Sequence, residues 1–435
     1  MTADPGRGLI LAAPGSGAGK TTVTLGILAA LTARGVPVRG AKSGPDYIDP
    51  QFHAAATGRP CVNLDAWAMA PEMIRSLATG PGTLVIEGAM GVFDGAVDGS
   101  ANGRGSCADL ARVLNLPVVL VVDAARMAHS IAPLVAGFAR FDPEVRIAGV
   151  ILNKVGSARH EALLRAALSP LDIPVLGALH RDAELGTPSR HLGLVQAQER
   201  ADLRSFLDLA GTRVGEAVDL DALCALAAPL PSALPASDQT GHLKPLGQRI
   251  AVARDDAFAF AYPHLLTAWR RAGAELLELS PLADDPIPTD VDAVFLPGGY
   301  PELHAGQLAS ATVFLDSLRS AAKDSVRIYG ECGGYMVLGD GLVDAAGTRH
   351  AMAGLLRLET SFAARKLHLG YRRLTPFGGG FAGALTGHEF HYARTLHAEG
   401  APLFAARDAA GEALPKMGLR MGSVAGSFAH LIAPA

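Results

Sequence analysis

Short apolar runs alternate with longer amphipathic stretches through the first half of the chain. The apolar runs cover residues 9–14, 36–42, 83–88, 117–124, 147–155 and 174–179. Nearly continuous apolar strands between helices are typical of a parallel sheet that is covered on both faces. Helical patterns lie between these runs, at Lys20–Arg34, Cys107–Leu114, Met127–Ala139 and Ala158–Leu168. The pattern therefore predicts a doubly wound α/β domain.

The alternation stops between residues 209 and 247 and then starts again. This segment is rich in Ala, Pro and Ser, a composition that is typical of linkers. Beyond it we expect strands at 249–255, 292–299 and from 326, with helices at Pro263–Arg271 and His304–Lys323. The predicted organisation is an α/β domain over 1–208, a linker over 209–247, and a second α/β domain over 248–435.

The composition narrows the class of protein. The chain has 435 residues, is 49% hydrophobic and has a formal net charge of −4, so it can bury substantial cores and is a poor match to a nucleic-acid binder. Its four cysteines form no CxxC pair, which argues against a zinc site or a disulfide framework and fits a reducing compartment. No apolar run reaches about 18 residues, and no signal peptide is evident. We expect a cytoplasmic protein without a membrane span.

A glycine-rich loop joins the first predicted strand to the first predicted helix. It reads PGSGAGKTT over residues 14–22, and Pro14 replaces the first glycine of the usual phosphate-loop pattern. Glycines let backbone N–H groups surround phosphate oxygens, while Lys20 meets the β/γ-phosphates and Thr21 can bind Mg²⁺. Asn153, at the end of another strand, can bind the adenine edge or serve the loop structurally. The expected ATP ligands are Gly15, Gly17, Gly19, Lys20, Thr21, Thr22 and Asn153.

Acidic residues follow two other predicted strands. Glu87 ends one strand, in a loop that also holds Asp94, and the segment KSGPDYIDP after another strand holds Asp46 and Asp49. The carboxyl ends of parallel strands share the rim on which the phosphate loop lies, and carboxylates hold the Mg²⁺ of ATP-using sites. The expected metal ligands are Thr21, Asp46 and Glu87. The alternative for each Asp is a turn-forming role beside Pro or Gly.

A second candidate site centres on Cys332, in the sequence GECGG between a predicted strand and a predicted helix. This context is typical of a nucleophile elbow, in which the helix N-terminus lowers the pKa of the thiol. Gly333 and Gly299 can supply the N–H groups of an oxyanion hole. A general base is also needed, and a buried structural thiol is the alternative. The candidate bases are His430, His388 and His391.

The phosphate loop and the cysteine elbow, in this order and with KSGPDYIDPQFH, EGAMGVFDG, LPGGYPE, YGECGGYM and GHEFHY, resemble one enzyme family. This is the cobyrinic acid / hydrogenobyrinic acid a,c-diamide synthase family of cobalamin biosynthesis, and the resemblance covers about residues 8–435. It implies a domain like dethiobiotin synthetase followed by a class I-type glutamine amidotransferase domain. The implied reaction amidates the a and c acetates of a corrinoid through an acyl phosphate. The implied substrates are the corrinoid polycarboxylate, ATP and glutamine, with Mg²⁺ as cofactor, and a homodimer is left open.

The resemblance also implies roles for individual residues. Cys332 would be the nucleophile and His430 its base, while the matching Mg-ATP positions are Lys20, Thr21, Asp46, Glu87 and Asp94. Tyr47 and Asp49 would lie at the carboxylate substrate, and Asp94 is assigned to substrate binding with them. One departure is that Ile432 replaces the Glu that usually follows the histidine by two residues. Either a backbone carbonyl or a remote acid such as Glu389 would then orient His430.

Three other functions compete with this interpretation. A cobyric acid synthase-type amidotransferase would act on other side chains of the same macrocycle. A ParA/MinD-type ATPase would carry an extra Lys early in the phosphate loop, where this chain has Pro14 and Gly15, and would have no cysteine-elbow domain. A non-enzymatic binding protein would have an inactive amidotransferase domain, and the intact Cys332 and His430 argue against it.

Overall fold

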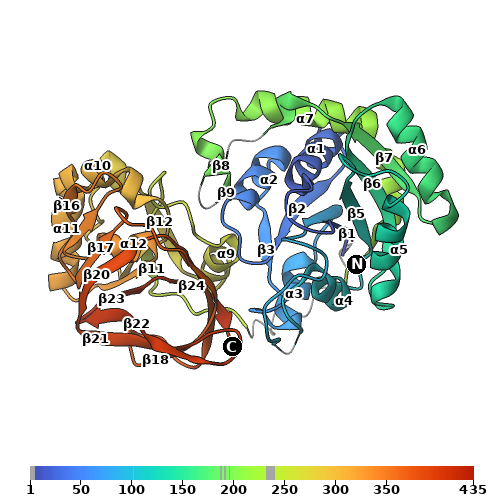
Figure 1. Ribbon diagram of the computed structural model, residues 1–435. Helices are drawn as coiled ribbons and strands as arrows, with labels where there is room; N and C mark the ends of the chain where they lie inside the picture. Colours follow the sequence, from blue (N-terminus) through green and yellow to red (C-terminus); the bar gives the residue numbers. More distant parts are fainter. Residues whose placement is uncertain (1–4, 101, 187–188, 191–192, 195, 232–240) are drawn as a thin grey trace. The chain divides into compact units, whose positions relative to one another are not determined.

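The computed structural model describes residues 5–100, 102–186, 189–190, 193–194, 196–231 and 241–435. The chain divides into two compact units, Met1–Thr240 and Gly241–Ala435 (Figure 1). None of the helices in these described ranges has the length and apolar character needed to cross a bilayer.

In the described part of the chain, the first unit is built on an eight-stranded sheet with the order β3-β2-β4-β1-β5-β6-β7. Neighbouring strands along this path are parallel, and β10 pairs antiparallel with the start of β1. The prediction of a doubly wound parallel sheet is confirmed. The strands are β1 (Arg7–Ala12), β2 (Val38–Ser43), β3 (Val62–Leu64), β4 (Thr83–Glu87), β5 (Val118–Asp123), β6 (Ile147–Val155), β7 (Val175–His180) and β10 (Ala228–Pro229).

Helices lie between these strands and cover the sheet (Figure 1). They are α1 (Lys20–Ala33), α2 (Asp49–Thr57), α3 (Pro71–Ala78), α4 (Cys107–Leu114), α5 (Ile131–Phe141), α6 (Ala158–Leu168), α7 (Leu203–Ala217) and α8 (Leu220–Leu226). Short 3-10 turns lie at Ser169–Leu171, Ala183–Leu185 and Ala197–Glu199, and the hairpin β8 (Ser189–Arg190) and β9 (Gly193–Leu194) precedes the last of them. Apart from boundary shifts of a few residues, the four helices predicted from the hydrophobic pattern are present.

The segment after residue 209 differs from the predicted linker. Helix α7 packs along α1, where small residues allow close approach: a methyl group at Gly26 would lie 2.3 Å from Val214 Cγ2. Helix α8 and strand β10 follow, so residues 209–229 belong to the first unit. The linker prediction was wrong here because it was based on an Ala-rich composition, and Ala has the highest helix propensity of all residues. Part of the predicted linker, residues 232–240, lies outside the described residues.

The second unit, as far as the structure describes it, holds a ten-stranded sheet with the order β12-β11-β13-β14-β23-β22-β21-β18-β19-β24. The strands from β12 to β23 are parallel and the remaining pairs are antiparallel. The strands are β11 (Arg249–Ala253), β12 (Glu275–Leu279), β13 (Ala293–Leu296), β14 (Arg327–Glu331), β18 (His368–Pro376), β19 (Leu385–His391), β21 (Ala401–Arg407), β22 (Ala413–Met421), β23 (Val424–Ser427) and β24 (Ala429–Pro434). The α/β class is confirmed, and the sheet also has an antiparallel half that the sequence pattern did not predict.

The remaining elements of the second unit complete its layers. A four-stranded sheet, ordered β16-β15-β17-β20 in the described residues, consists of β15 (Gly341–Val343), β16 (Arg349–Ala351), β17 (Arg357–Ser361) and β20 (Arg394–Glu399). The helices are α9 (Pro263–Arg271), α10 (Ala305–Ser310), α11 (Thr312–Lys323) and α12 (Gly333–Val337), with 3-10 turns at Pro281–Ala283 and Pro301–Leu303. The single helix predicted over 304–323 is therefore two helices that meet at Ala311.

Candidate functional site

The glycine-rich loop lies between the end of β1 and the start of α1. Gly17 and Gly19 adopt φ values of +80° and +84°, a left-handed conformation that favours glycine. A methyl group at Gly15 or Gly17 would meet no atom within 4 Å, so a ligand can approach the loop backbone closely. The buried Lys20 donates from Nζ to the carbonyl of Gly15 at 3.4 Å and to that of Met90. The loop therefore has the form of a phosphate-binding loop.

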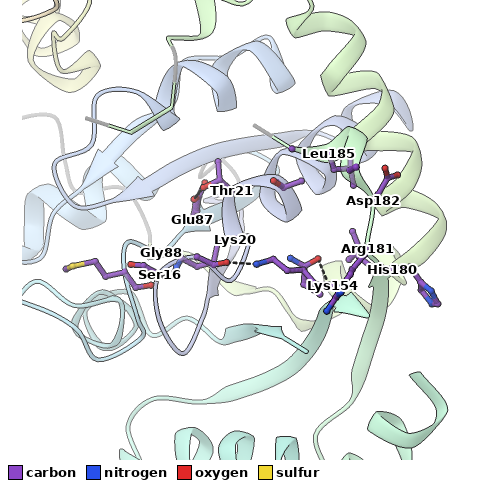
Figure 2. A pocket seen from close by; sticks show the side chains of 18 of the residues that line it. Ser16, Lys20, Thr21, Glu87, Gly88, Lys154, His180, Arg181, Asp182 and Leu185 are labelled. Atoms are coloured by element: carbon purple, nitrogen blue, oxygen red, sulfur yellow. Dashed lines mark hydrogen bonds between the residues drawn. The ribbon is translucent and has the colours of Figure 1, made fainter. Parts of the chain in front are cut away.

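A cavity of about 850 Å³ opens over this loop, within the size range of small-molecule sites. Its lining comes from the loop, from the ends of β2, β4, β6 and β7, and from the segment that follows β7. Figure 2 shows Lys20, Thr21 and Glu87 on one side of the cavity and His180, Arg181 and Asp182 on the other. The cavity thus joins the phosphate loop to an acidic cluster at the ends of neighbouring strands.

Lys42, at the end of β2, is the centre of this cluster. Its Nζ lies 2.9 Å from Glu87 Oε1 and 3.7 Å from Asp46 Oδ2, and it also contacts Asp49 Oδ2. Thr21 Oγ1 donates to Glu87 Oε1 at 2.6 Å and lies 3.5 Å from Asp49 Oδ2. The register explains the convergence, because Glu87 on β4 is paired with Lys42 on β2. The sequence alone did not predict this role for Lys42.

The charges of the cluster support one another. Burial alone would lower the pKa of Lys42, but Asp49 and Glu87 raise it well above its ordinary value. Burial would raise the pKa of Glu87, but Lys42 and His53 hold it well below its usual range. For Asp49, burial and the charge of Asp46 raise the pKa to about 7, although Lys42 opposes the shift. Glu87 is therefore ionised, and Asp49 titrates near neutrality.

His53, on α2, holds the second oxygen of the Glu87 carboxylate. Its Nε2 lies 2.7 Å from Glu87 Oε2, and both side chains are buried. Cys61 Sγ lies 3.5 Å from the other ring nitrogen. Gly40 makes room for the ring, since a methyl group there would lie 2.9 Å from His53 Cβ. Burial would lower the pKa of His53, but Cys61 and Glu87 raise it to about 10. The motif KSGPDYIDPQFH ends in His53, but the sequence alone did not predict this role.

The other predicted residues of the first unit divide between the cluster and the loop. Asp46 accepts hydrogen bonds from the backbone N–H groups of Ile48 and Asp49 at 2.8 and 3.1 Å, so it forms a turn as well as facing Lys42. Tyr47 is buried on the same turn. Asp94 accepts from the N–H of Gly91 at 2.8 Å and so shapes the loop after β4.

Asn153 and Lys154, at the end of β6, brace the phosphate loop. Asn153 Nδ2 donates to the carbonyl of Ala18 at 2.8 Å. Lys154 Nζ donates to the carbonyl of Gly17 and to Asp123 Oδ2, each at 2.7 Å. Both residues also line the cavity. The structural alternative considered for Asn153 therefore has direct support, and its contact with adenine stays a prediction.

In the second unit, Cys332 lies in a sharp turn between β14 and α12. Its φ and ψ values are +46° and −103°, a conformation that is strained for a residue with a side chain. Small neighbours are required: a methyl group at Gly334 would lie 2.0 Å from the carbonyl oxygen of Leu296, and one at Gly330 would lie 2.8 Å from Gly334. The Cys332 N–H donates to the carbonyl of Ser427 at 2.8 Å. This is the geometry of a nucleophile elbow.

The pKa of the Cys332 thiol differs from the sequence prediction. Burial raises it, as does the charge of Glu302, while a hydrogen bond from the backbone of Gly333 opposes the shift. Helix α12 has only five residues, so its N-terminus offers little compensation for burial beside a carboxylate. The expectation that the helix lowers this pKa was wrong for the free protein, and the thiol needs a base.

His430, on β24, flanks the same glycine as Cys332. A methyl group at Gly298 would lie 2.3 Å from His430 Cε1, 3.0 Å from His430 Nε2 and 3.2 Å from Cys332 Cβ. Burial lowers the pKa of His430 to about 3, and the nearby His388 and His391 add to this shift. The imidazole is therefore neutral at neutral pH, the form that a general base requires.

Gly299 and Gly333 lie side by side next to the thiol. A methyl group at Gly333 would lie 3.0 Å from the backbone nitrogen of Gly299, and one at Gly299 would lie 2.0 Å from the carbonyl oxygen of Ala257. Neither position has room for a side chain, so glycine is required at both for these two backbone segments to lie this close. This arrangement suits a pair of oxyanion donors.

Two buried acids lie near the imidazoles of this site. Glu331 Oε2 is 3.7 Å from His430 Nδ1, and Glu331 Oε1 accepts from the N–H of Leu431 at 3.0 Å. Burial raises the pKa of Glu331 to about 8. Glu389 instead lies 2.9 Å from His391 Nε2 and 2.7 Å from a guanidinium nitrogen of Arg372. Sequence reasoning named Glu389 and missed Glu331.

Comparison with known proteins gives the same division of the chain. Residues 9–195 match the CobQ/CobB/MinD/ParA nucleotide binding domain, and residues 249–435 match the CobB/CobQ-like glutamine amidotransferase domain. Both matches fall within the units that hold the corresponding sites.

Proteins named hydrogenobyrinate a,c-diamide synthase are similar over almost the entire chain. The one from Brucella abortus is 58% identical over 433 residues, which cover 98% of each chain. Those from Rhizobium meliloti and Rhodobacter capsulatus are 56% and 52% identical, each over 98% of this chain and 99% of the relative. This chain therefore belongs to the hydrogenobyrinate a,c-diamide synthase family of glutamine amidotransferases.

Proposed function

We propose that this protein uses ATP and glutamine to convert the a and c acetate groups of hydrogenobyrinate, or of its cobalt-containing counterpart, into carboxamides. The observation that carries the proposal is the presence of two unlike sites on one chain. One is a phosphate loop beside a lysine–carboxylate cluster, and the other is a thiol–imidazole pair at a glycine-lined elbow. Similarity to the diamide synthases, which extends over nearly the whole chain, supports this choice of substrate over other side chains of the macrocycle.

The first site activates the carboxylate. A carboxylate oxygen of the substrate attacks the γ-phosphorus of ATP, ADP leaves, and an acyl phosphate results. Lys20 and the backbone of the glycine-rich loop bind the transferring phosphoryl group and stabilise its charge. Lys42 keeps Glu87 ionised by pairing with it and also contacts Asp49, which titrates near neutrality.

The residues of this site fit a divalent cation. Thr21, Asp46 and Glu87 offer only oxygen atoms, the ligands that Mg²⁺ prefers. Thr21 Oγ1 and Glu87 Oε1 are already 2.6 Å apart at the mouth of the phosphate loop. When bound there, Mg²⁺ neutralises charge on the β- and γ-phosphates.

The second site releases ammonia. His430 takes the thiol proton of Cys332, and the sulfur attacks the side-chain amide carbon of glutamine. The N–H groups of Gly299 and Gly333 stabilise the oxyanion that forms. His430 then donates its proton to the leaving ammonia, and water hydrolyses the thioester to glutamate. Ammonia attacks the acyl phosphate, and phosphate leaves.

The cellular setting follows from this chemistry. ATP, glutamine and a soluble polycarboxylate are small molecules of the cytoplasm, where thiols such as Cys332 stay reduced. We therefore assign the protein to that compartment and assign it no nucleic-acid partner. A homodimer remains compatible with the proposal.

The Cys332→Ala variant tests the division of labour. We expect it to lose glutamine-dependent amidation and to keep ammonia-dependent amidation, while Lys20→Ala loses both. Product masses, measured with hydrogenobyrinate and with cobyrinate, report the substrate and the number of amides formed. Loss of both activities in a folded Cys332→Ala protein would contradict the proposal.

A further inference from the structure

We propose that Glu331, the residue immediately before the nucleophile, is the positioning carboxylate of the glutaminase site. It holds His430 in the orientation in which the imidazole accepts the proton of Cys332. This inference rests on the proposed function, since it assigns a role within the same thiol–imidazole site.

The carboxylate is fixed against the strand that carries the base. Glu331 ends β14 and is 2% exposed. Its Oε1 accepts the N–H of Leu431, the residue next to His430, at 3.0 Å. The other oxygen is thereby directed at the imidazole, 3.7 Å from Nδ1. Because both contacts involve β24, any shift of Glu331 is transmitted to the base.

The imidazole presents its two nitrogens to different partners. Nε2 lies on the side of Gly298, the glycine that also adjoins Cys332. Nδ1 is the nitrogen that faces Glu331. An acid at one ring nitrogen and a nucleophile at the other is the order that a hydrolytic triad requires. Here the acid comes from the strand before the nucleophile, and Ile432 occupies the position after the base where class I enzymes carry it.

The alternatives considered for this role are otherwise engaged. Both oxygens of Glu389 have cationic or imidazole partners, namely Arg372 and His391. The backbone of Phe260 also hydrogen-bonds His430, but it is neutral. When it is ionised, Glu331 adds the negative charge that a backbone carbonyl lacks.

The charge matters when the proton moves. Transfer of the thiol proton to His430 Nε2 creates an imidazolium in a buried site, where a lone cation is costly. An ionised carboxylate at Nδ1 stabilises that cation and favours the tautomer whose Nε2 carries no proton. Glu331 is ionised above its pKa of about 8, and the imidazolium stabilises that ionised form further. The proton later leaves with ammonia, so Glu331 ends the cycle unchanged.

Glu331→Gln in the full-length protein is the critical variant. Its amide oxygen can still accept the Leu431 N–H, while the negative charge is lost. We expect kcat for glutamine hydrolysis to fall on the order of 10²- to 10⁴-fold, with KM for glutamine changed by no more than about twofold. Ammonia-dependent amidation should remain at the wild-type level. Glu331→Asp, which keeps the charge, should be more active than Glu331→Gln.

Controls separate this role from a structural one. Glu278→Gln removes an exposed acid of the same unit and should leave all activities unchanged. Urea unfolding followed by Trp269, a buried residue of this unit, should give the wild-type midpoint for Glu331→Gln. Wild-type kcat in Glu331→Gln, an equally impaired Glu331→Asp, or a parallel loss of folding would each overturn the inference.

A parallel Cys332→Ala measurement separates the two proposals. If Cys332→Ala keeps glutamine-dependent activity, the proposed function fails. If Cys332→Ala is inactive with glutamine and Glu331→Gln is not impaired, only the role of Glu331 fails.

Discussion

Replacement of Lys42 by Met should destabilise the first unit strongly. The side chain is 5% exposed and pairs with Asp46, Asp49 and Glu87. Removing one partner of a buried ion pair costs about 3–5 kcal/mol, because charge remains buried without compensation. Two features favour the lower end of that range. His53 still pairs with Glu87, and Asp49 can take up a proton, since its pKa is already about 7. We expect the free energy of unfolding of the first unit to fall by about 3 kcal/mol at pH 8.

The stability lost in the Lys42→Met variant should depend on pH. Lys42 lowers the pKa of Asp49, so its loss raises that pKa further and the folded variant binds more protons than the folded wild type. By linkage, the variant gains stability relative to wild type as pH falls, by up to about 1.4 kcal/mol per pH unit for one proton. The stability difference should therefore be smaller at pH 6 than at pH 8.

The two tryptophans provide a clean assay. Trp67 lies in the first unit and Trp269 in the second, and both are buried. In a Trp269→Phe background, fluorescence during urea unfolding reports the first unit. The matched control is Lys154→Met, because Lys154 pairs with Asp123 at a half-exposed site where an ion pair contributes at most about 1 kcal/mol. The reasoning would be refuted if Lys42→Met lowered the free energy of unfolding no more than Lys154→Met does. It would also be refuted if the loss caused by Lys42→Met did not depend on pH.

Three further predictions address other parts of the molecule. Gly298→Ala should displace the imidazole of His430, because the new methyl group would lie 2.3 Å from Cε1. We expect glutamine-dependent amidation to fall at least about 100-fold and ammonia-dependent amidation to be retained. Full glutamine-dependent activity would contradict the geometry. His53→Asn should raise the Mg²⁺ concentration for half-maximal nucleotide binding by about 10–100-fold, since it removes the group that holds Glu87. Equilibrium binding of a fluorescent ATP analogue measures this concentration, and an unchanged Mg²⁺ dependence would count against the prediction. The second unit should lose stability as pH falls from 6.5 to about 4, because burial lowers the pKa of His264 to about 4 and the unfolded chain takes up the proton first. The loss is about 3 kcal/mol for this residue, and His264→Gln should flatten the pH profile measured by Trp269 fluorescence in a Trp67→Phe background.

Features that depend on residues adjacent in the chain were predictable from the sequence. The strands of the first unit are short apolar runs, and the phosphate loop and the cysteine elbow are local glycine patterns. Each requires only the chain before and after it. The linker prediction failed for the same reason, because local composition does not reveal that α7 packs against α1, far away in the sequence.

Contacts between distant strands were harder to predict. Glu87 meets Lys42 and Thr21 only because β4 lies between β2 and β1 in the sheet. Nothing in the sequence around Glu331 distinguishes it from an ordinary strand residue, and its partner Leu431 is 100 residues away. The pairing of β19 with β24, which places His388 opposite His430, likewise depends on the antiparallel half of the sheet, which the hydrophobic pattern did not predict.

Isotope transfer tests the central claim most directly, namely that a phosphorylated carboxylate is captured by ammonia released at Cys332. Hydrogenobyrinate with ¹⁸O-labelled acetate carboxylates would be incubated with Mg-ATP, [amide-¹⁵N]glutamine and the full-length protein. The account predicts that each amide formed carries ¹⁵N and that one ¹⁸O atom appears in phosphate for every amide. Amide formation with unlabelled phosphate, or without consumption of ATP, would contradict it.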